Sequence, residues 1–234
     1  MACLCPDALI LSSSSNEDLT DGDLKEMGVR LANEVIDFVE KHSSSFYIIG
    51  KLSFIAHSLG GLIVRSALPL LSRYKGSFNF FVTLSSPHVG ITNRLIEGGV
   101  MFLSLFKKSK VLEQLTLRDA VNLEDCELYQ LASMDELGWF RRVILVGSNQ
   151  DRYAPTSTSI LSDSSDEVPQ RRLQMKFRES LSRTACQTMD VSFDIQESPT
   201  LDTVLGRAAH IKFLESPVLI ELILLLIVDL IEIS

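Results

Sequence analysis

Apolar residues follow two kinds of pattern along this chain, helical spacing in some segments and short continuous runs in others. Apolar residues at helical spacing run from about Asp23 to Lys41 and predict an amphipathic helix. Short, almost continuous apolar runs predict buried strands at Leu52–Ile55, Phe78–Leu84 and Arg142–Gly147. A helical pattern follows the first of these runs and extends to about Ser72. Because strands alternate with helices, we expect an α/β fold with a mostly parallel sheet and helices on both faces.

Two weaker patterns predict strands near the ends of the chain. Ala8–Leu11 is a short apolar run followed by a serine-rich, acidic stretch, and we interpret it as a first strand. Met189–Ile195 alternates apolar and polar residues, which predicts a last strand with Asp190 and Asp194 on its polar face. We expect a loop after this strand.

The remaining segments leave more than one interpretation open. The apolar stretch within 91–120 fits either a cap-like insertion over a site or an ordinary core helix. The polar stretch 157–172 predicts an exposed loop. Near the C-terminus, Leu222–Val228 is an uninterrupted apolar run of seven residues, whereas a membrane-spanning helix needs about 20. We expect a buried terminal helix on the sheet, with peripheral membrane contact as the less favoured alternative.

Composition narrows the class of protein. With 234 residues, of which 46% are hydrophobic, the chain can form one sizeable domain spanning residues 1–234. A net charge of −8 argues against nucleic acid or an anionic membrane as a charge-driven partner. The four cysteines have neither metal-site nor disulfide-framework spacing. No basic stretch precedes an apolar N-terminal core, so we expect no signal peptide and a cytoplasmic protein with reduced thiols.

The strongest chemical signal is the pentapeptide Ala56-His57-Ser58-Leu59-Gly60, between a predicted strand and a predicted helix. A serine held between small residues in this context is typical of the nucleophile elbow of α/β-hydrolases, although Ala56 replaces the usual first glycine. The elbow lifts the serine hydroxyl above the sheet, where a base can reach it. The alternative is a chance match, which the flanking strand and helix make less probable than catalysis.

Chain order then points to two partners for Ser58. In α/β-hydrolases the acid follows the serine and the histidine follows the acid. Asp151 lies on a loop directly after the Arg142–Gly147 strand, where it could alternatively cap a turn. His210 is the one histidine after Asp151, although a lone histidine is more often structural. His88 precedes the acid, so it has the wrong place for the base, and we expect it either to be structural or to support the site from nearby.

These three residues define a concrete reaction. His210 would take the Ser58 proton as general base, and Asp151 would orient its imidazole. Ser58 would attack an acyl carbonyl to give an acyl-enzyme that water hydrolyses. The backbone N–H of Leu59, the residue after the nucleophile, would contribute to the oxyanion hole. This chemistry implies no metal and no organic cofactor.

Four stretches together resemble the family of lipase-like serine esterases that includes the yeast Rog-type lipases. The first two are 52–61 and 81–90. The third is 115–120, which leads to 143–153, and the last is 205–211. The resemblance implies an α/β-hydrolase fold, a triad of Ser58, Asp151 and His210, and a lipid or other apolar acyl ester as substrate.

The chain departs from that family before Ser58. No His-Gly pair, which in the family supplies an oxyanion-hole donor, lies upstream of the serine. We therefore expect an N-terminally truncated member that lacks the early strands of the sheet. The predicted function is carboxylic ester hydrolysis on a lipid or small-molecule ester. The alternative is an impaired hydrolase-like protein that binds a lipid or a protein partner.

Overall fold

Four parallel strands form a sheet in the part of this protein that the structure describes. The computed structural model describes residues 8–43, 50–91, 109–162, 167–195 and 202–232. The strands are β1 (Leu52–His57), β2 (Phe78–Leu84), β3 (Arg142–Gly147) and β4 (Ala185–Asp190), and they lie in the order β1-β2-β3-β4. Val82 of β2 pairs with Ile55 of β1 and with Ile144 of β3. The expected parallel α/β architecture is confirmed.

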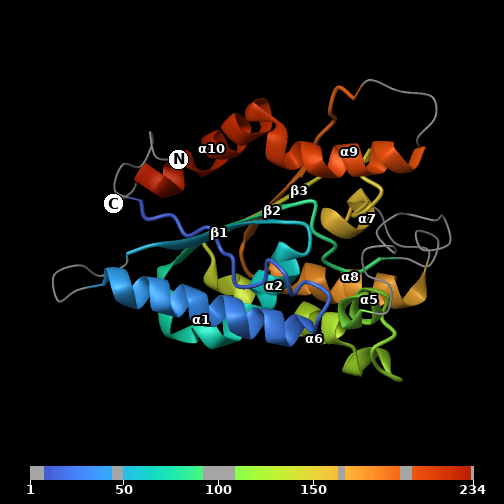
Figure 1. Cartoon of the computed structure of the whole chain (residues 1–234), viewed down its shortest axis with the longest axis horizontal. Helices are drawn as coiled ribbons and strands as arrows, with labels where there is room; N and C mark the ends of the chain where they lie inside the picture. Colours follow the sequence, from blue (N-terminus) through green and yellow to red (C-terminus); the bar gives the residue numbers. More distant parts are fainter. Residues whose placement is uncertain (1–7, 44–49, 92–108, 163–166, 196–201, 233–234) are drawn as a thin grey trace.

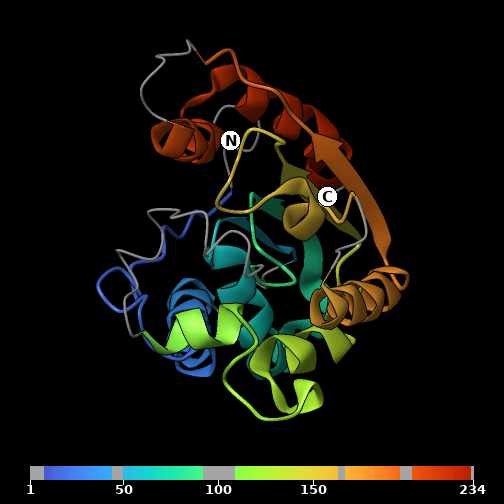
Figure 2. The same cartoon turned by 90° about the vertical axis from the view of Figure 1, so that its right-hand side faces the viewer.

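Alternating side chains of the central strands supply two hydrophobic cores. Phe80, Val82 and Leu84 of β2 belong to the core on the side of the C-terminal helices, which we call the upper core. Phe81 belongs to the core on the other face, which we call the lower core. Because successive strand residues point to opposite faces, a fully buried strand needs helices on both sides. Figures 1 and 2 show one group of helices below the sheet and a second group above it. The lower group includes α1 (Leu24–His42), α2 (Gly60–Ala67), α6 (Glu127–Ser133) and α8 (Val168–Leu181), and the upper group is α9 (Asp202–Glu215) and α10 (Pro217–Glu232).

Local chemistry sets the ends of the first two helices. Asp23 caps α1, because its side chain accepts a hydrogen bond from the backbone N–H of Lys25 at 2.7 Å. The α-helix that follows β1 was expected to reach Ser72 but ends at Ala67. Pro69 lacks an N–H group, and the chain continues as a 3₁₀ helix, η1 (Leu68–Ser77).

The segment 91–120, which fitted either a cap-like insertion or a core helix, is described only in part. Residues 92–108 of the cap-like insertion lie outside the described residues. The adjoining helix α5 (Lys110–Leu115) buries Val111 and Leu115 in the lower core, as an ordinary core helix does. Two short 3₁₀ helices, η2 (Leu123–Asp125) and η3 (Glu136–Trp139), flank α6.

The expectation of an exposed loop over 157–172 was wrong. Helix α7 (Thr156–Ser159) occupies its start, and α8 begins at Val168. Ser159 is fully buried, since Gly147 leaves room for its side chain beside the end of β3. Small hydroxyl residues that look like loop residues in sequence are therefore buried here. Residues 163–166 of this segment lie outside the described part.

Both terminal strand predictions need correction. Ala8–Leu11 forms no strand, and Leu9 and Ile10 are exposed, because this stretch pairs with none of the described strands. The last strand is Ala185–Asp190 rather than Met189–Ile195, because its ladder with β3 begins where Ala185 pairs with Arg142. The side chains still alternate between partly buried and exposed after the strand ends, and those of Val191 and Phe193 pack against the upper core.

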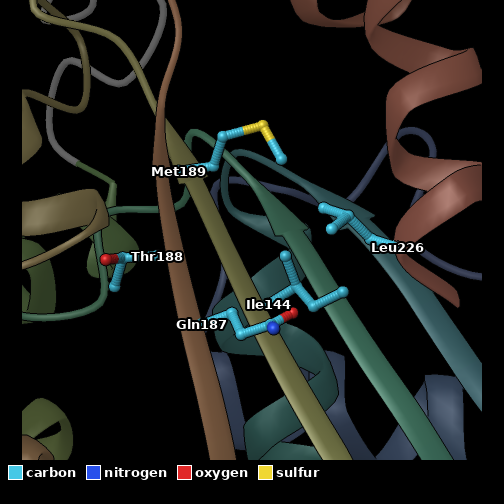
Figure 3. Close-up of a pocket in the computed structure, with 5 residues that line it drawn as sticks. All are labelled: Ile144, Gln187, Thr188, Met189 and Leu226. Atoms are coloured by element: carbon cyan, nitrogen blue, oxygen red, sulfur yellow. The ribbon is translucent and has the colours of Figure 1, made fainter.

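Helix α10 covers the upper face of the sheet, as expected for the C-terminal apolar run. Leu219, Ile223, Ile227 and Leu230 recur at helical spacing and are buried against the strands. A crevice of about 280 Å³ remains between α10 and the edge of the sheet. Figure 3 shows its lining residues, which are Ile144, Gln187, Thr188, Met189 and Leu226. Within the described ranges, no helix combines the length and apolar character needed to cross a bilayer.

Candidate active site

Ser58 occupies a sharp turn between β1 and α2. Its φ of 54° lies in the left-handed region, which is uncommon for a residue other than glycine. The turn is held because the Ser58 N–H donates to the Leu84 carbonyl at the end of β2, at 2.9 Å. Gly60 and Ala56 are neighbours across this turn, because a Cβ added to Gly60 would lie 3.6 Å from the Cβ of Ala56, an ordinary van der Waals contact. The strained turn at the carboxyl end of a strand is the geometry of a nucleophile elbow.

Asp151 lies on the loop after β3 and is 1% exposed. Its Oδ1 accepts hydrogen bonds from the backbone N–H groups of Tyr153 at 2.7 Å and Ala154 at 3.3 Å. The loop therefore turns around the carboxylate, as the turn-capping interpretation anticipated. The second carboxylate oxygen, Oδ2, remains available for side chains from other segments.

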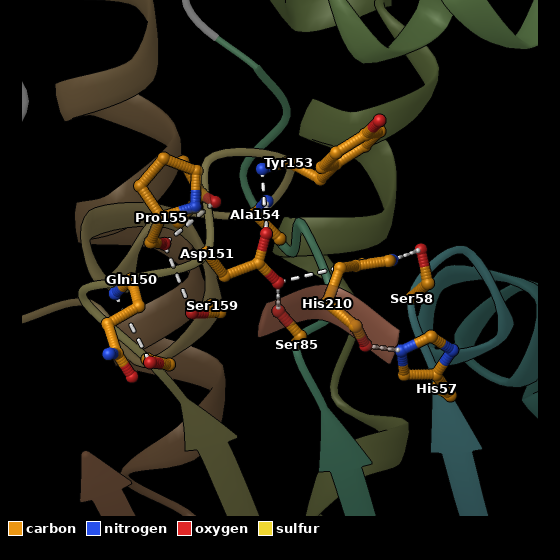
Figure 4. Close-up of polar contacts among 12 residues, drawn as sticks. His57, Ser58, Ser85, Gln150, Asp151, Tyr153, Ala154, Pro155, Ser159 and His210 are labelled. Carbon is orange, nitrogen blue, oxygen red and sulfur yellow. Dashed lines mark hydrogen bonds and ion pairs between the residues drawn. The ribbon is translucent and has the colours of Figure 1, made fainter. Parts of the chain in front are cut away.

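His210 lies in helix α9, which corrects the expectation of a loop. Residues 202–215 form one helix after β4, and its buried residues Ala209 and Phe213 flank the histidine along the helix. The helix carries His210 across the carboxyl ends of the strands (Figures 1 and 4). A helical residue has a fixed direction relative to its neighbours, so the packing of Phe213 also sets the direction of the imidazole.

The three residues selected by chain order form one continuous chain of hydrogen bonds (Figure 4). His210 Nδ1 lies 2.6 Å from Asp151 Oδ2, and His210 Nε2 lies 2.9 Å from Ser58 Oγ. A carboxylate only accepts, so Nδ1 carries a proton that it donates to Asp151. In the neutral imidazole Nε2 is then an acceptor, and the Ser58 hydroxyl donates to it. This protonation pattern is the one a general base needs before it removes a serine proton.

Two further residues surround this chain, and sequence reasoning missed both. The Ser85 hydroxyl donates to Asp151 Oδ2 from the first position after β2, where its φ is 50°. The ring of Tyr153 stacks on the imidazole of His210 with 5.2 Å between centroids. Ser85 could have been found from its place, because it follows a parallel strand next to β1 and β3 and so meets the same edge of the sheet.

The other two histidines near this edge differ in their contacts. His57 directly precedes Ser58, and its ring lies 4.6 Å from that of His210. Burial, and then the charge of the nearby His210, lower the pKa of His57 to about 4. His88 is fully buried, as expected of a structural residue, and contacts Thr83 and Arg65. Burial, and then the charge of Arg65, hold the pKa of His88 well below its usual range.

The backbone of Leu59 provides a hydrogen-bond donor beside the serine. Leu59 is the N-cap of α2, and the first N–H groups of a helix have no acceptor within the helix. Such N–H groups, together with the helix dipole, stabilise negative charge. No group of three or more histidine, cysteine, aspartate or glutamate side chains suited to a metal ion occurs in the part of the chain that the structure describes.

Comparisons with known proteins place the chain in a family. Residues 6–166 match the family described as "Putative serine esterase (DUF676)". A Saccharomyces cerevisiae protein named "Putative lipase YDL109C" is 31% identical over 154 residues, which cover 61% of this chain and 23% of that protein. The chain thus spans only about a quarter of the length of this relative.

A solved structure is also similar, at low identity. It is described as "the putative cell surface hydrolase from Lactobacillus plantarum WCFS1", with 10% identity, a TM-score of 0.39, and coverage of 82% of this chain and 63% of that chain. At this TM-score the likeness carries no argument about function. The family match covers more than half of the chain and includes Ser58 and Asp151. The chain belongs to the family described as "Putative serine esterase".

Proposed function

We propose that this protein is a serine hydrolase that cleaves carboxylic esters with an apolar acyl group. The observation that carries the proposal is the continuous hydrogen-bond chain from Ser58 through His210 to Asp151. Ser58 is the nucleophile, His210 is the general base, and Asp151 orients the imidazole and stabilises its charged form. Each residue comes from the loop or helix that follows a different strand of the sheet.

The reaction has two steps with the same groups. Nε2 of His210 removes the Ser58 proton while Oγ attacks the ester carbonyl carbon, and the protonated imidazole then returns that proton to the departing alcohol. This step leaves an acyl group on Ser58. Water, activated by the same His210 nitrogen, attacks the acyl carbonyl and releases the acid. The free hydroxyl of Ser58 is thereby restored.

The N–H of Leu59 stabilises the negative oxygen that develops in each step. Its position directly after the nucleophile places it next to the carbonyl under attack. A single donor of this kind is worth roughly 10²–10³ in kcat. Because a backbone group serves this role, its contribution depends on the turn at Ser58 rather than on the identity of the leucine side chain.

The proposal of an apolar acyl group rests on family membership and on a relative named as a lipase. It can be tested with a series of p-nitrophenyl esters from acetate to dodecanoate. We expect kcat/KM to rise with chain length, since each methylene removed from water contributes about 0.8 kcal/mol. A rate that peaks at acetate and falls with length would contradict the apolar preference.

The first test of the enzyme is labelling by a fluorophosphonate, which reacts with activated serines. We expect the wild-type chain to be labelled at one site, and we expect Ser58→Ala to abolish labelling. His210→Ala should slow it, because the nucleophile loses its base. Ser182→Ala is a matched control, because Ser182 is exposed and its hydroxyl donates to the Glu179 carbonyl, far from this site. Absence of labelling in a wild-type protein that melts cooperatively would overturn the proposal and leave a non-catalytic binding protein.

A further inference from the structure

His57 links the strand that ends at the proposed nucleophile to the helix that carries the proposed base. Its Nε2 lies 2.9 Å from the backbone carbonyl oxygen of His210 (Figure 4). Its ring also lies 4.6 Å from the His210 ring and 6.4 Å from the Phe213 ring, measured between centroids. His57 therefore contacts two residues of α9 that are one turn apart.

The direction of this hydrogen bond defines the protonation of His57. A carbonyl oxygen only accepts, so Nε2 of His57 carries the proton and donates it. Burial, and then the charge of His210, lower the pKa of His57 to about 4, although the hydrogen bond to the His210 backbone and the nearby Asp151 act in the opposite direction. The imidazole is therefore neutral at physiological pH, with Nε2 as donor and Nδ1 without a proton. It is a fixed neutral donor rather than a second base.

His210 must be placed accurately relative to Ser58, although the two residues are far apart in the sequence. Ser58 and His210 are 152 residues apart, and their side chains must meet within hydrogen-bond distance. Within α9, Phe213 is fully buried and meets Phe193 at 5.1 Å between ring centroids, which holds the helix against the segment after β4. The bond from His57 instead holds the backbone of His210 itself, and it comes from the residue adjacent to Ser58.

We propose that His57 is a positioning residue, whose Nε2–H fixes the backbone of His210 so that the imidazole meets Ser58 Oγ and Asp151. Because His57 and Ser58 are consecutive, the end of β1 holds both the nucleophile and the main chain of its base. This role rests on the proposed function of the same site. A shift of the base by about 1 Å can slow an enzymatic reaction by about 10²-fold, so the contact has a measurable consequence.

The test compares His57→Gln with His57→Met. The two side chains have nearly the same length and volume, but only glutamine carries a donor near the position of Nε2. We expect His57→Met to lower the fluorophosphonate labelling rate and kcat by about 10- to 100-fold with little change in KM. We expect His57→Gln to restore most of this loss. Equal rates in the wild type and in His57→Met, or a loss in His57→Gln as large as in His57→Met, would overturn the proposal.

A readout independent of turnover separates this proposal from the proposed function. The proton on His210 Nδ1 that is donated to Asp151 can be observed by ¹H–¹⁵N NMR of the whole chain. We expect this resonance to shift or broaden in His57→Met and to persist in His57→Gln, whether or not the protein hydrolyses esters. An unchanged resonance in His57→Met would contradict the positioning role.

The wild-type protein provides a last check that needs no variant. The ¹⁵N shifts of the His57 ring should report a neutral imidazole with its proton on Nε2 at pH 7. A proton on Nδ1 would overturn the proposal, because the carbonyl of His210 would then have no donor. A wild-type protein that shows these NMR signatures but is not labelled would instead contradict the proposed function alone.

Discussion

Asp151 accepts hydrogen bonds from four groups of the described residues, and only one of them is the proposed base. Two backbone N–H groups and the Ser85 hydroxyl hold the carboxylate, and His210 Nδ1 is the fourth donor. A carboxylate fixed in this way by its own loop and by Ser85 can orient an imidazole without moving. The groups that hold Asp151 in place are therefore different from the imidazole on which it acts.

Replacement of Asp151 by asparagine should therefore affect the reaction far more than the fold. The amide can keep the bonds from the loop, but it no longer stabilises a charged imidazole or enforces the proton on Nδ1. We expect Asp151→Asn to lower kcat by about 10³–10⁴, measured with the best p-nitrophenyl ester. Asp194→Asn, at an exposed position after β4, is the control. A loss of less than tenfold in Asp151→Asn would exclude the assigned role.

Sequence reasoning selected Ser58, Asp151 and His210 but missed Ser85, Tyr153 and His57. The three were found because their order along the chain and their places after predicted strands restrict the choice. Ser85 and His57 act through single hydrogen bonds to residues 66 and 153 positions away. The place of Ser85 after a strand brings it to the same edge of the sheet, but its contact with Asp151, like that of His57 with His210, depends on how loops and helices pack.

At the scale of elements, the two glycines after Ser58 have different neighbours. A Cβ on Gly61 would lie 2.3 Å from Ser86 Oγ and 2.7 Å from Ser86 Cβ, whereas Gly60 has only a normal contact with Ala56. Helix α2 can therefore approach the end of β2 only because residue 61 lacks a side chain. The stretch 52–61 contains both glycines, but only packing distinguishes their roles.

We expect Gly61→Ala to destabilise the protein by about 1–3 kcal/mol, because α2 must move away from Ser86. Gly60→Ala should change the free energy of unfolding by less than about 0.5 kcal/mol. Urea denaturation of both variants would measure the difference. Equal stabilities would show that the approach of α2 to the loop after β2 is not a tight one.

Helix α10 provides a similar contrast between its two sides. Ile227 is fully buried against the sheet, whereas Leu225, two residues earlier, is 70% exposed. We expect Ile227→Ala to lower the free energy of unfolding by about 2–5 kcal/mol, and Leu225→Ala to change it by less than about 0.5 kcal/mol. A comparable loss from both variants, again measured in urea, would mean that the outer side of α10 is covered in solution.

At the scale of the whole molecule, two neutral histidines, the partly buried His57 and the fully buried His88, make stability depend on pH. The pKa of His57 is lowered to about 4 and that of His88 lies well below its usual range, whereas an unfolded histidine titrates near 6.5. The unfolded chain therefore binds more protons as the pH falls below 6.5. Their contribution to stability is complete above that pH and is lost progressively toward pH 4.

We expect the free energy of unfolding to fall between pH 6.5 and pH 5, with a slope of up to about 1.4 kcal/mol per pH unit for each histidine. Urea titrations at several pH values would measure this slope. His57→Gln should reduce it by about half, since one of the two groups no longer titrates. A stability that is constant or rises over this range would contradict the lowered pKa values of these two histidines in the folded protein.

The sequence by itself determined the class of fold and the three residues of the proposed triad. Burial on both faces of a strand and on one face of a helix leaves a periodic pattern, so the parallel α/β arrangement could be predicted from local order. Tertiary structure alone decided that His210 lies on a helix, that β4 begins at Ala185, and that Ser85 and His57 join the site. The physical reason is that strand register and side-chain convergence depend on contacts between distant segments, which no local periodicity records.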